Sequence, residues 1–107
     1  MTVRRGEVVL VAIPNQKARP SIVLTPEWLS RHSLDVSVVP LTTVARTRFP
    51  TRVELPAGEG GLNKASWAKC DQVTTVPKTL LISQPFGRVS PALLEAIEAA
   101  VRLSLGL

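Results

Sequence analysis

Residues 7–25, EVVLVAIPNQKARPSIVLT, decide the fold of this chain. They contain two short runs rich in β-branched side chains, residues 7–13 and residues 21–25. The segment between the runs, residues 14–20, begins and ends with proline. β-Branched runs of this length with turn-forming residues at their ends are typical of strands. The stretch therefore predicts two strands joined by a short polar connection.

Further strands are expected downstream of this pair. Residues 35–43 (DVSVVPLTT) predict a third strand, in which Pro40 implies an edge position or a bulge because proline has no N–H to donate. Residues 51–55 alternate with a two-residue period and predict a fourth strand. Residues 67–76 predict one long, half-polar strand, and residues 86–89 a last short one.

Two connecting segments are less regular. Residues 56–61 (PAGEGG) hold three glycines and predict a turn, since glycine adopts positive φ readily. Residues 79–83 are compatible with either a turn of helix or a short strand.

The last segment carries start and stop signals for a helix. Ser90 is a good N-cap, Pro91 occupies the favoured first helical position, and Gly106 stands where a helix ends. Glu98 and Arg102 are spaced to form a surface ion pair one turn apart. Several short strands and one terminal amphipathic helix predict a mostly β fold, a small barrel closed by a helix. The apolar positions at helical spacing are Leu93, Ile97, Ala100, Val101 and Leu105.

Length and composition restrict the class of protein. The chain has 107 residues, of which 45% are hydrophobic and 20% charged, so we expect one globular domain over residues 1–107. No apolar run approaches the roughly 18 to 20 residues of a membrane helix. Residues 1–10 lack the features of a signal peptide. One cysteine (Cys70) and one histidine (His32) allow no disulfide within the chain and no ordinary zinc site, so a cytoplasmic location is expected.

The charge is strongly positive and unevenly distributed. Thirteen Lys and Arg residues against eight Asp and Glu give a net charge of +5. Residues 1–89 carry twelve of the bases and six of the acids, so the excess lies there. Such an excess favours a polyanionic partner, although an arginine-rich composition is equally compatible with a GC-rich genome.

Familiar catalytic motifs are absent from the sequence. There is no HExxH, no phosphate-binding P-loop and no GxGxxG or GxSxG pattern. The lone histidine also excludes ribonuclease chemistry that uses a histidine pair. The candidates that remain are polar residues at the ends of the predicted strands.

Five short blocks of sequence follow one another along nearly the whole chain. They are RGEV (5–8), ARPSIVLT (18–25), VPLTT (39–43), KCDQ (69–72) followed by TTV (74–76), and GRVS (87–90). In this order the blocks resemble the MazF/PemK family of toxin endoribonucleases. The resemblance implies an SH3-like barrel, a homodimer, cleavage of single-stranded RNA with no metal or other cofactor, and an antitoxin that blocks the enzyme. We expect that antitoxin to use an acidic segment, because the chain is basic.

Two residues match positions that the family uses in catalysis, Arg19 and Thr42. When a 2′-hydroxyl attacks the neighbouring phosphorus, negative charge builds on the phosphorane oxygens, and an arginine with a hydroxyl donor suits that charge. Arginine has a pKa too high for ordinary proton transfer at neutral pH. Lys69 and Asp71 match positions proposed as acid and base in some relatives, and are equally compatible with a solvated ion pair on one strand face.

Several other residues are expected to bind RNA. Many relatives carry a longer glycine-rich loop with a Glu or His between the first two strands, whereas residues 14–18 are short and offer only Asn15, Gln16 and Lys17. The identity of the general base and the cleaved RNA sequence therefore stay open. Arg46, Arg48, Arg52 and Lys64 lie on and around the loops after the third and fourth predicted strands. They are compatible with a solvated basic surface, and the positive charge of the chain favours a groove that follows the RNA phosphates. The residues that we expect to contact RNA are Lys17, Thr43, Arg46, Lys64 and Gln72.

The remaining reactive or aromatic residues receive more ordinary interpretations. Cys70 is expected in the core, because the two-residue period of the predicted strand puts it on the same face as Ala68. His32 is expected on an exposed loop. Trp28 and Trp67 could stack on bases, although core packing is expected to use at least one of them.

Two other functions remain alternatives at this point. Toxins that inhibit DNA gyrase share the expected fold, but their C-terminal tail carries a tryptophan, which residues 103–107 lack. A plain SH3-like module that binds RNA without cleaving it is also compatible with the charge. Incubation with single-stranded RNA in EDTA distinguishes the three.

Overall fold

The hairpin expected from residues 7–25 forms at the centre of the fold. A computed structural model describes residues 2–45 and 48–107. β1 (Glu7–Val11) and β2 (Arg19–Val23) pair antiparallel, with Val11 opposite Arg19. β2 begins two residues earlier than predicted, because the pairing with β1 extends back through Pro20 to Arg19.

β3 (Asp35–Thr42) is the strand around which the sheet is organised. One edge pairs with β2, and the other edge pairs first with β6 (Thr74–Pro77) and then with β5 (Ser66–Lys69). β3 is therefore a central strand, so of the two alternatives expected for Pro40 the edge position is wrong and the bulge is the one found. Pro40 lies between the part of β3 that pairs with β6 and the part that pairs with β5. At this position neither strand needs a backbone N–H from β3, so a residue without an N–H fits there.

The single long strand expected over residues 67–76 is interrupted. Ala68 pairs with Leu41, and Thr74 pairs with Val38. The chain therefore advances six residues from Ala68 to Thr74 while β3 advances only three between the same two pairs. The surplus residues form a turn, in which the Gln72 N–H donates to the Lys69 carbonyl over 2.9 Å. This turn is a large bulge opposite Pro40, and it separates β5 from β6.

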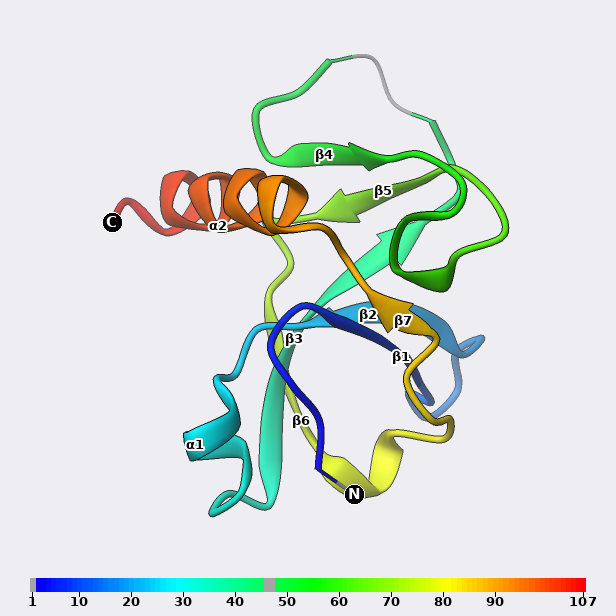
Figure 1. Cartoon of the computed structure of the whole chain (residues 1–107), viewed down its shortest axis with the longest axis vertical. Coiled ribbons are helices and arrows are strands. Elements are labelled where there is room, and N and C mark those ends of the chain that lie inside the picture. Colours follow the sequence, from blue (N-terminus) through cyan, green and yellow to red (C-terminus); the bar gives the residue numbers. More distant parts are fainter. Residues whose placement is uncertain (1, 46–47) are drawn as a thin grey trace.

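The remaining elements complete a half-barrel (Figure 1). β4 (Arg52–Leu55) pairs with β5, and β7 (Gly87–Arg88) pairs with β1, so the strand order is β4-β5-β3-β2-β1-β7 with β6 beside β3. The prediction of a mostly β fold with a C-terminal helix is confirmed, as an open half-barrel. The sequence pattern gave no sign of α1 (Glu27–Ser30), a single turn, and left open η2 (Lys78–Leu80), which is a 3-10 turn.

α2 (Pro91–Leu105) has the predicted boundaries. The Ser90 hydroxyl accepts the Leu93 N–H, and Gly106 ends the helix at φ 73°. Leu105 is exposed, which corrects its placement on the apolar face. Glu98 does not pair with Arg102: its carboxylate accepts the Arg5 guanidinium at 2.5 Å, which ties the N-terminal segment to the helix.

The core consists of two clusters, one on each side of the β1–β2–β3 sheet. The cluster beneath α2 uses Val8, Ile22, Leu41, Leu55 and Ile97, and the other uses Val9, Val11, Val23, Val36 and Val38. Alternate residues of β1 and β2 therefore enter different clusters, as the two-residue period of a strand requires. Within the described residues, no helix is long and apolar enough to cross a membrane.

A glycine contact joins the turn after β4 to β7. η1 (Glu59–Gly61) lies directly against β7, and a Cβ on Gly87 would stand 2.9 Å from the Gly60 carbonyl carbon. Gly60 itself is buried at φ +60°, and a Cβ there would stand 2.5 Å from a methyl group of Val8. The backbones approach this closely only because side chains are missing.

Replacing Gly60 should therefore lower the free energy of unfolding more than replacing Gly58, which also has a positive φ but has open space where a Cβ would stand. A Cβ on Gly58 (φ +98°) would meet nothing within 4 Å, so Gly58→Ala should cost about 1–2 kcal/mol for the backbone alone. Gly60→Ala should cost about 1–3 kcal/mol more, since Val8 must move. Urea denaturation of the two variants measures the difference, and equal costs would contradict the packing argument.

Candidate functional site

The ends of β2 and β3 bring the two predicted catalytic residues together. Ser21 lies opposite Pro40 in this antiparallel pair, and continuing the register by two residues places Arg19 opposite Thr42. Opposite residues of an antiparallel pair project on the same face. Both residues line one small pocket of about 140 Å³, the central pocket, together with Lys17 and Thr43.

Three further pockets adjoin the central pocket through shared residues. The inner pocket, about 330 Å³, shares Arg19. The Arg52 pocket, about 410 Å³, shares Thr42, and the Lys64 pocket, about 470 Å³, shares Thr43. We refer to these four pockets as the pocket cluster.

The inner pocket occupies the place where β3 changes partner. Val38 and Pro40 of β3 line it together with Lys69, Gln72 and Thr74, which lie in and around the bulge. Lys69 also lines the Arg52 pocket. The interruption that the sequence pattern did not predict is therefore what builds this pocket.

Most of the predicted site residues gather in the pocket cluster. Two do not: Arg46 lies outside the described residues, and Asp71 does not line the four pockets. The Asp71 carboxylate lies 3.9 Å from the Arg52 guanidinium, so the surface pairing of Asp71 with Lys69 is wrong, because the strand ends at Lys69 and the chain turns. The predicted residues that line the cluster are Arg19, Thr42, Lys69, Lys17, Thr43, Lys64 and Gln72.

The two central side chains are placed to donate hydrogen bonds. The Thr42 hydroxyl oxygen accepts the Val44 N–H at 3.1 Å, which fixes the oxygen and leaves its proton available to an acceptor. In the described part of the chain, no hydrogen bond or ion pair engages the Arg19 guanidinium. Its five N–H donors therefore face solvent in the absence of a ligand.

Among the described residues, the lining of the pocket cluster contains cations and no acid. Lys17, Arg19, Arg52, Lys64 and Lys69 line the four pockets, and neither Asp nor Glu does. Such an arrangement produces a positive potential that attracts phosphate groups.

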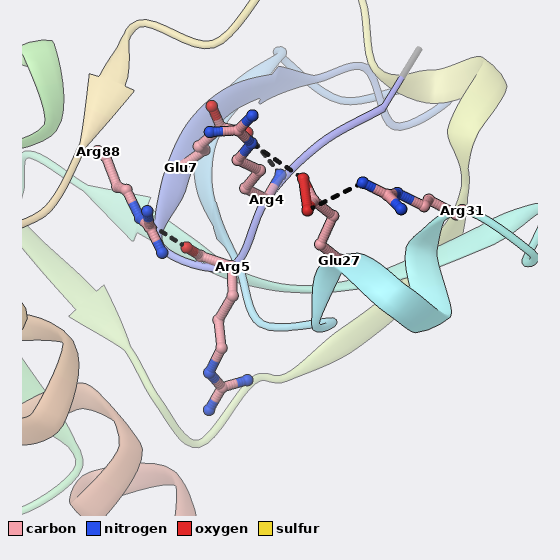
Figure 2. A network of polar contacts seen from close by, with 6 residues as sticks. All are labelled: Arg4, Arg5, Glu7, Glu27, Arg31 and Arg88. Atoms are coloured by element: carbon pink, nitrogen blue, oxygen red, sulfur yellow. Dashed lines mark hydrogen bonds and ion pairs between the residues drawn. The ribbon is translucent and has the colours of Figure 1, made fainter.

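Three cations near the N-terminus and α1 are paired with carboxylates. Figure 2 shows Arg4 and Arg31 approaching Glu27 from its two sides, at 3.0 and 3.3 Å. Arg5 points away from this network toward α2, where it meets Glu98. Arg4 and Arg5 of the N-terminal segment are thus paired with acids, whereas of the five cations that line the pocket cluster only Arg52 has a carboxylate within 4 Å among the described residues, that of Asp71.

Cys70 lies next to the site without taking part in it. It is fully buried in the core, as expected, and burial raises the pKa of its thiol to about 11, with the Asp71 carboxylate adding to the rise and Arg52 opposing it. A thiol with so high a pKa is a poor nucleophile at neutral pH. His32 is exposed, also as expected, and Trp28 is 69% exposed on α1.

Arg52 is the site residue whose importance the sequence does not reveal. Its position in the chain groups it with the basic loops, whereas its side chain is 10% exposed and lines the Arg52 pocket. It lies opposite Lys69 across the β4–β5 pair. No local signal in TRVEL distinguishes a buried arginine from an exposed one, since the burial comes from β5. Across residues 2–45 and 48–107, no group of three or more His, Cys, Asp or Glu residues is placed to hold a metal ion.

Comparison with known proteins gives consistent matches. Residues 4–105 match the family described as PemK-like, MazF-like toxin of type II toxin-antitoxin system. Over 90 residues the chain is 39% identical to endoribonuclease MazF3 of Mycobacterium tuberculosis, covering 81% of this chain and 85% of that protein.

Solved structures give the same picture. A mycobacterial endoribonuclease in complex with its cognate antitoxin is 30% identical, with a TM-score of 0.86 over 98% of this chain and 96% of that one. The MazE–MazF complex of Deinococcus radiodurans, at 19% identity, has a TM-score of 0.85 over 100% of this chain and 98% of that one, which supports the fold.

Proposed function

Because this chain belongs to the family of PemK-like, MazF-like toxins of type II toxin-antitoxin systems, we propose that the pocket cluster binds and cleaves single-stranded RNA. The protein is a MazF-like endoribonuclease toxin that a cognate antitoxin neutralises. The observation that carries the proposed site is that Arg19 and Thr42 line one pocket, together with Lys17 and, among the described residues, with no carboxylate.

The proposed reaction uses the RNA's own nucleophile. The 2′-hydroxyl attacks the adjacent phosphorus, the bond from phosphorus to the 5′-oxygen breaks, and the products carry a 2′,3′-cyclic phosphate and a 5′-hydroxyl. The phosphorane oxygens accept hydrogen bonds from the Arg19 guanidinium and the Thr42 hydroxyl, which hold the developing charge. No metal ion or other cofactor is part of this proposal.

Two proton transfers accompany the reaction. Lys69 lines pockets that also contain Arg19 and Thr42, and its ammonium group is our candidate acid for the leaving 5′-oxygen. Asp71 is the candidate base for the 2′-hydroxyl, two residues further along the bulge. The Asp71 carboxylate lies 3.9 Å from the Arg52 guanidinium.

The rest of the cluster is proposed to position the strand. Lys17 and Lys64 suit phosphates, while Thr43 and Gln72 offer hydrogen bonds to sugars or bases. Arg46, which lies outside the described residues, stays a predicted RNA contact from the sequence alone. We propose that the toxin acts in the cytoplasm, where messenger RNA is translated.

The direct test is cleavage in the presence of EDTA. Purified protein should convert a long single-stranded RNA into defined fragments, with 2′,3′-cyclic phosphate and 5′-hydroxyl ends. Sequencing the fragment ends then identifies the cleaved motif. Binding without fragments would instead favour the plain RNA-binding module.

Removing either central donor should abolish most of the cleavage. Arg19→Ala and Thr42→Ala should each lower kcat by about 100-fold or more, with much smaller losses of RNA affinity, because each donor acts mainly on transition-state charge. Arg19→Lys should also be impaired, since an ammonium lacks the planar fork. Arg31→Ala, which removes an exposed charge beside α1, is the control for net charge. A variant at either central position that cleaves at the wild-type rate would remove that residue from the site.

RNA and antitoxin should compete for the pocket cluster. An acidic antitoxin segment would place carboxylates among the same cations, folding as it binds. Charge reversal at Lys64 should weaken the binding of both RNA and antitoxin. Added salt should lower the affinity for RNA more steeply than the affinity for antitoxin, because RNA releases condensed counterions when it binds. Two-colour fluorescence anisotropy measures both ligands at once. A complex that accepts antitoxin while keeping its RNA would contradict competition.

We also propose that the toxin is a two-fold homodimer. Pairing two basic chains of this size extends the surface available to one RNA strand. Light scattering at about 20 µM, a generous concentration for a specific interface, should give twice the mass of the 11.6 kDa chain. A monomer at that concentration would argue against the dimer.

A further inference from the structure

Arg52 is a buried cation whose hydrogen-bonding groups are incompletely satisfied. Its side chain is 10% exposed, and neither Nε nor Nη1 has a hydrogen-bond partner among the described residues. The Asp71 carboxylate lies 3.9 Å from Nη1, which is beyond hydrogen-bond distance. The guanidinium therefore has a partial counter-charge and unused donors.

An arginine in this state is costly to the folded protein. Buried polar groups are nearly always hydrogen-bonded, and a buried charge is stabilised only when it is both paired and hydrogen-bonded. Packing alone does not explain why β4 begins with this residue. A ligand that brings acceptor oxygens to Arg52 would explain it.

The Arg52 pocket has room and chemistry for such a ligand. It measures about 410 Å³ and is lined by Thr42, Val44, Ala45, Arg52 and Lys69. Lys69 lies opposite Arg52 across the β4–β5 pair, so two cations on neighbouring strands contribute to one cavity. None of the lining residues is acidic, which favours an anion over a cationic or apolar ligand.

The pocket also adjoins the proposed centre of cleavage. Thr42 belongs to both the Arg52 pocket and the central pocket, and Lys69 belongs to both the Arg52 pocket and the inner pocket. A strand of RNA whose scissile phosphate lies between Arg19 and Thr42 would extend into one of the adjoining pockets.

We propose that Arg52 binds a phosphodiester next to the one that is cleaved, and so holds the RNA strand in register with Arg19 and Thr42. This inference rests on the proposed function and extends it to a second phosphate. The guanidinium donates N–H groups to the non-bridging oxygens, and Lys69 adds a second positive charge from the opposite strand. Because phosphates are the same in every sequence, Arg52 contributes affinity and positioning rather than base recognition.

The test neutralises one RNA phosphate at a time. The probe is a short RNA spanning the mapped cleavage motif, made resistant by a 2′-deoxy sugar at the attacking nucleotide, with one methylphosphonate linkage moved stepwise along it. In wild-type protein, one linkage adjacent to the scissile one should lower affinity by about tenfold or more when neutralised. In Arg52→Gln, the same substitution should cost little, because its partner is already gone. Arg31→Gln, which removes an equal charge beside α1, should keep the wild-type profile.

Other measurements keep the proposal testable if Arg52→Gln fails to fold. Arg52→Lys retains the charge and should reduce rather than erase the dependence on that linkage. In wild-type protein, the Nε–H signal of Arg52 in a nitrogen-edited NMR spectrum should shift when the 2′-deoxy RNA without a methylphosphonate is added. It should not shift when the added RNA carries the methylphosphonate at the linkage that Arg52 binds.

Two failures can be told apart. A protein that cleaves RNA but responds identically to every methylphosphonate in the wild-type and Arg52 variants, or whose Arg52 Nε–H signal ignores the probe, overturns the Arg52 proposal alone. A protein that cuts no RNA overturns the proposed cleavage site, and this inference with it.

Discussion

The structure depends on how β3 uses its two edges. One edge is occupied by β2, and the other passes from β6 to β5 at Pro40, a residue that can donate no backbone hydrogen bond. The surplus chain on the opposite side forms a bulge, and bulges at barrel rims commonly redirect side chains into sites. Here the bulge supplies Lys69 and Gln72 to the inner pocket, while the β2–β3 register supplies Arg19 and Thr42.

The second organising feature is that cations paired with carboxylates and cations without such partners lie in different parts of the molecule. Arg4, Arg5 and Arg31 have carboxylate partners on the helices, whereas in the described part of the chain the cations of the pocket cluster have one distant contact, between Arg52 and Asp71. Grouping like charges lowers the stability of the free protein, and a polyanion relieves that repulsion when it binds. The same arrangement underlies the proposal that RNA and an acidic antitoxin segment compete for the pocket cluster.

Local sequence signals predicted what local chemistry controls. The capping residues Ser90 and Gly106 give both ends of α2. The resemblance to toxin endoribonucleases selects Arg19 and Thr42, which line one pocket, and their part in catalysis stays a prediction. Features that depend on distant partners were not predictable in this way. Glu98 pairs with Arg5, 93 residues away, and the burial of Arg52 follows from the position of β5. The break between β5 and β6 likewise follows from pairing with β3, since the residues involved alternate as a strand would.

Amide chemical shifts measured with bound RNA test the central claim, that the pocket cluster is where the toxin holds its substrate. Labelled protein would be titrated with a 2′-deoxy-blocked RNA that contains the cleaved motif. The account predicts that the largest shifts occur over residues 17–21, 41–45 and 64–72, which line or adjoin the four pockets. Shifts centred instead on α1 or on the C-terminal half of α2, with the pocket residues unmoved, would contradict it.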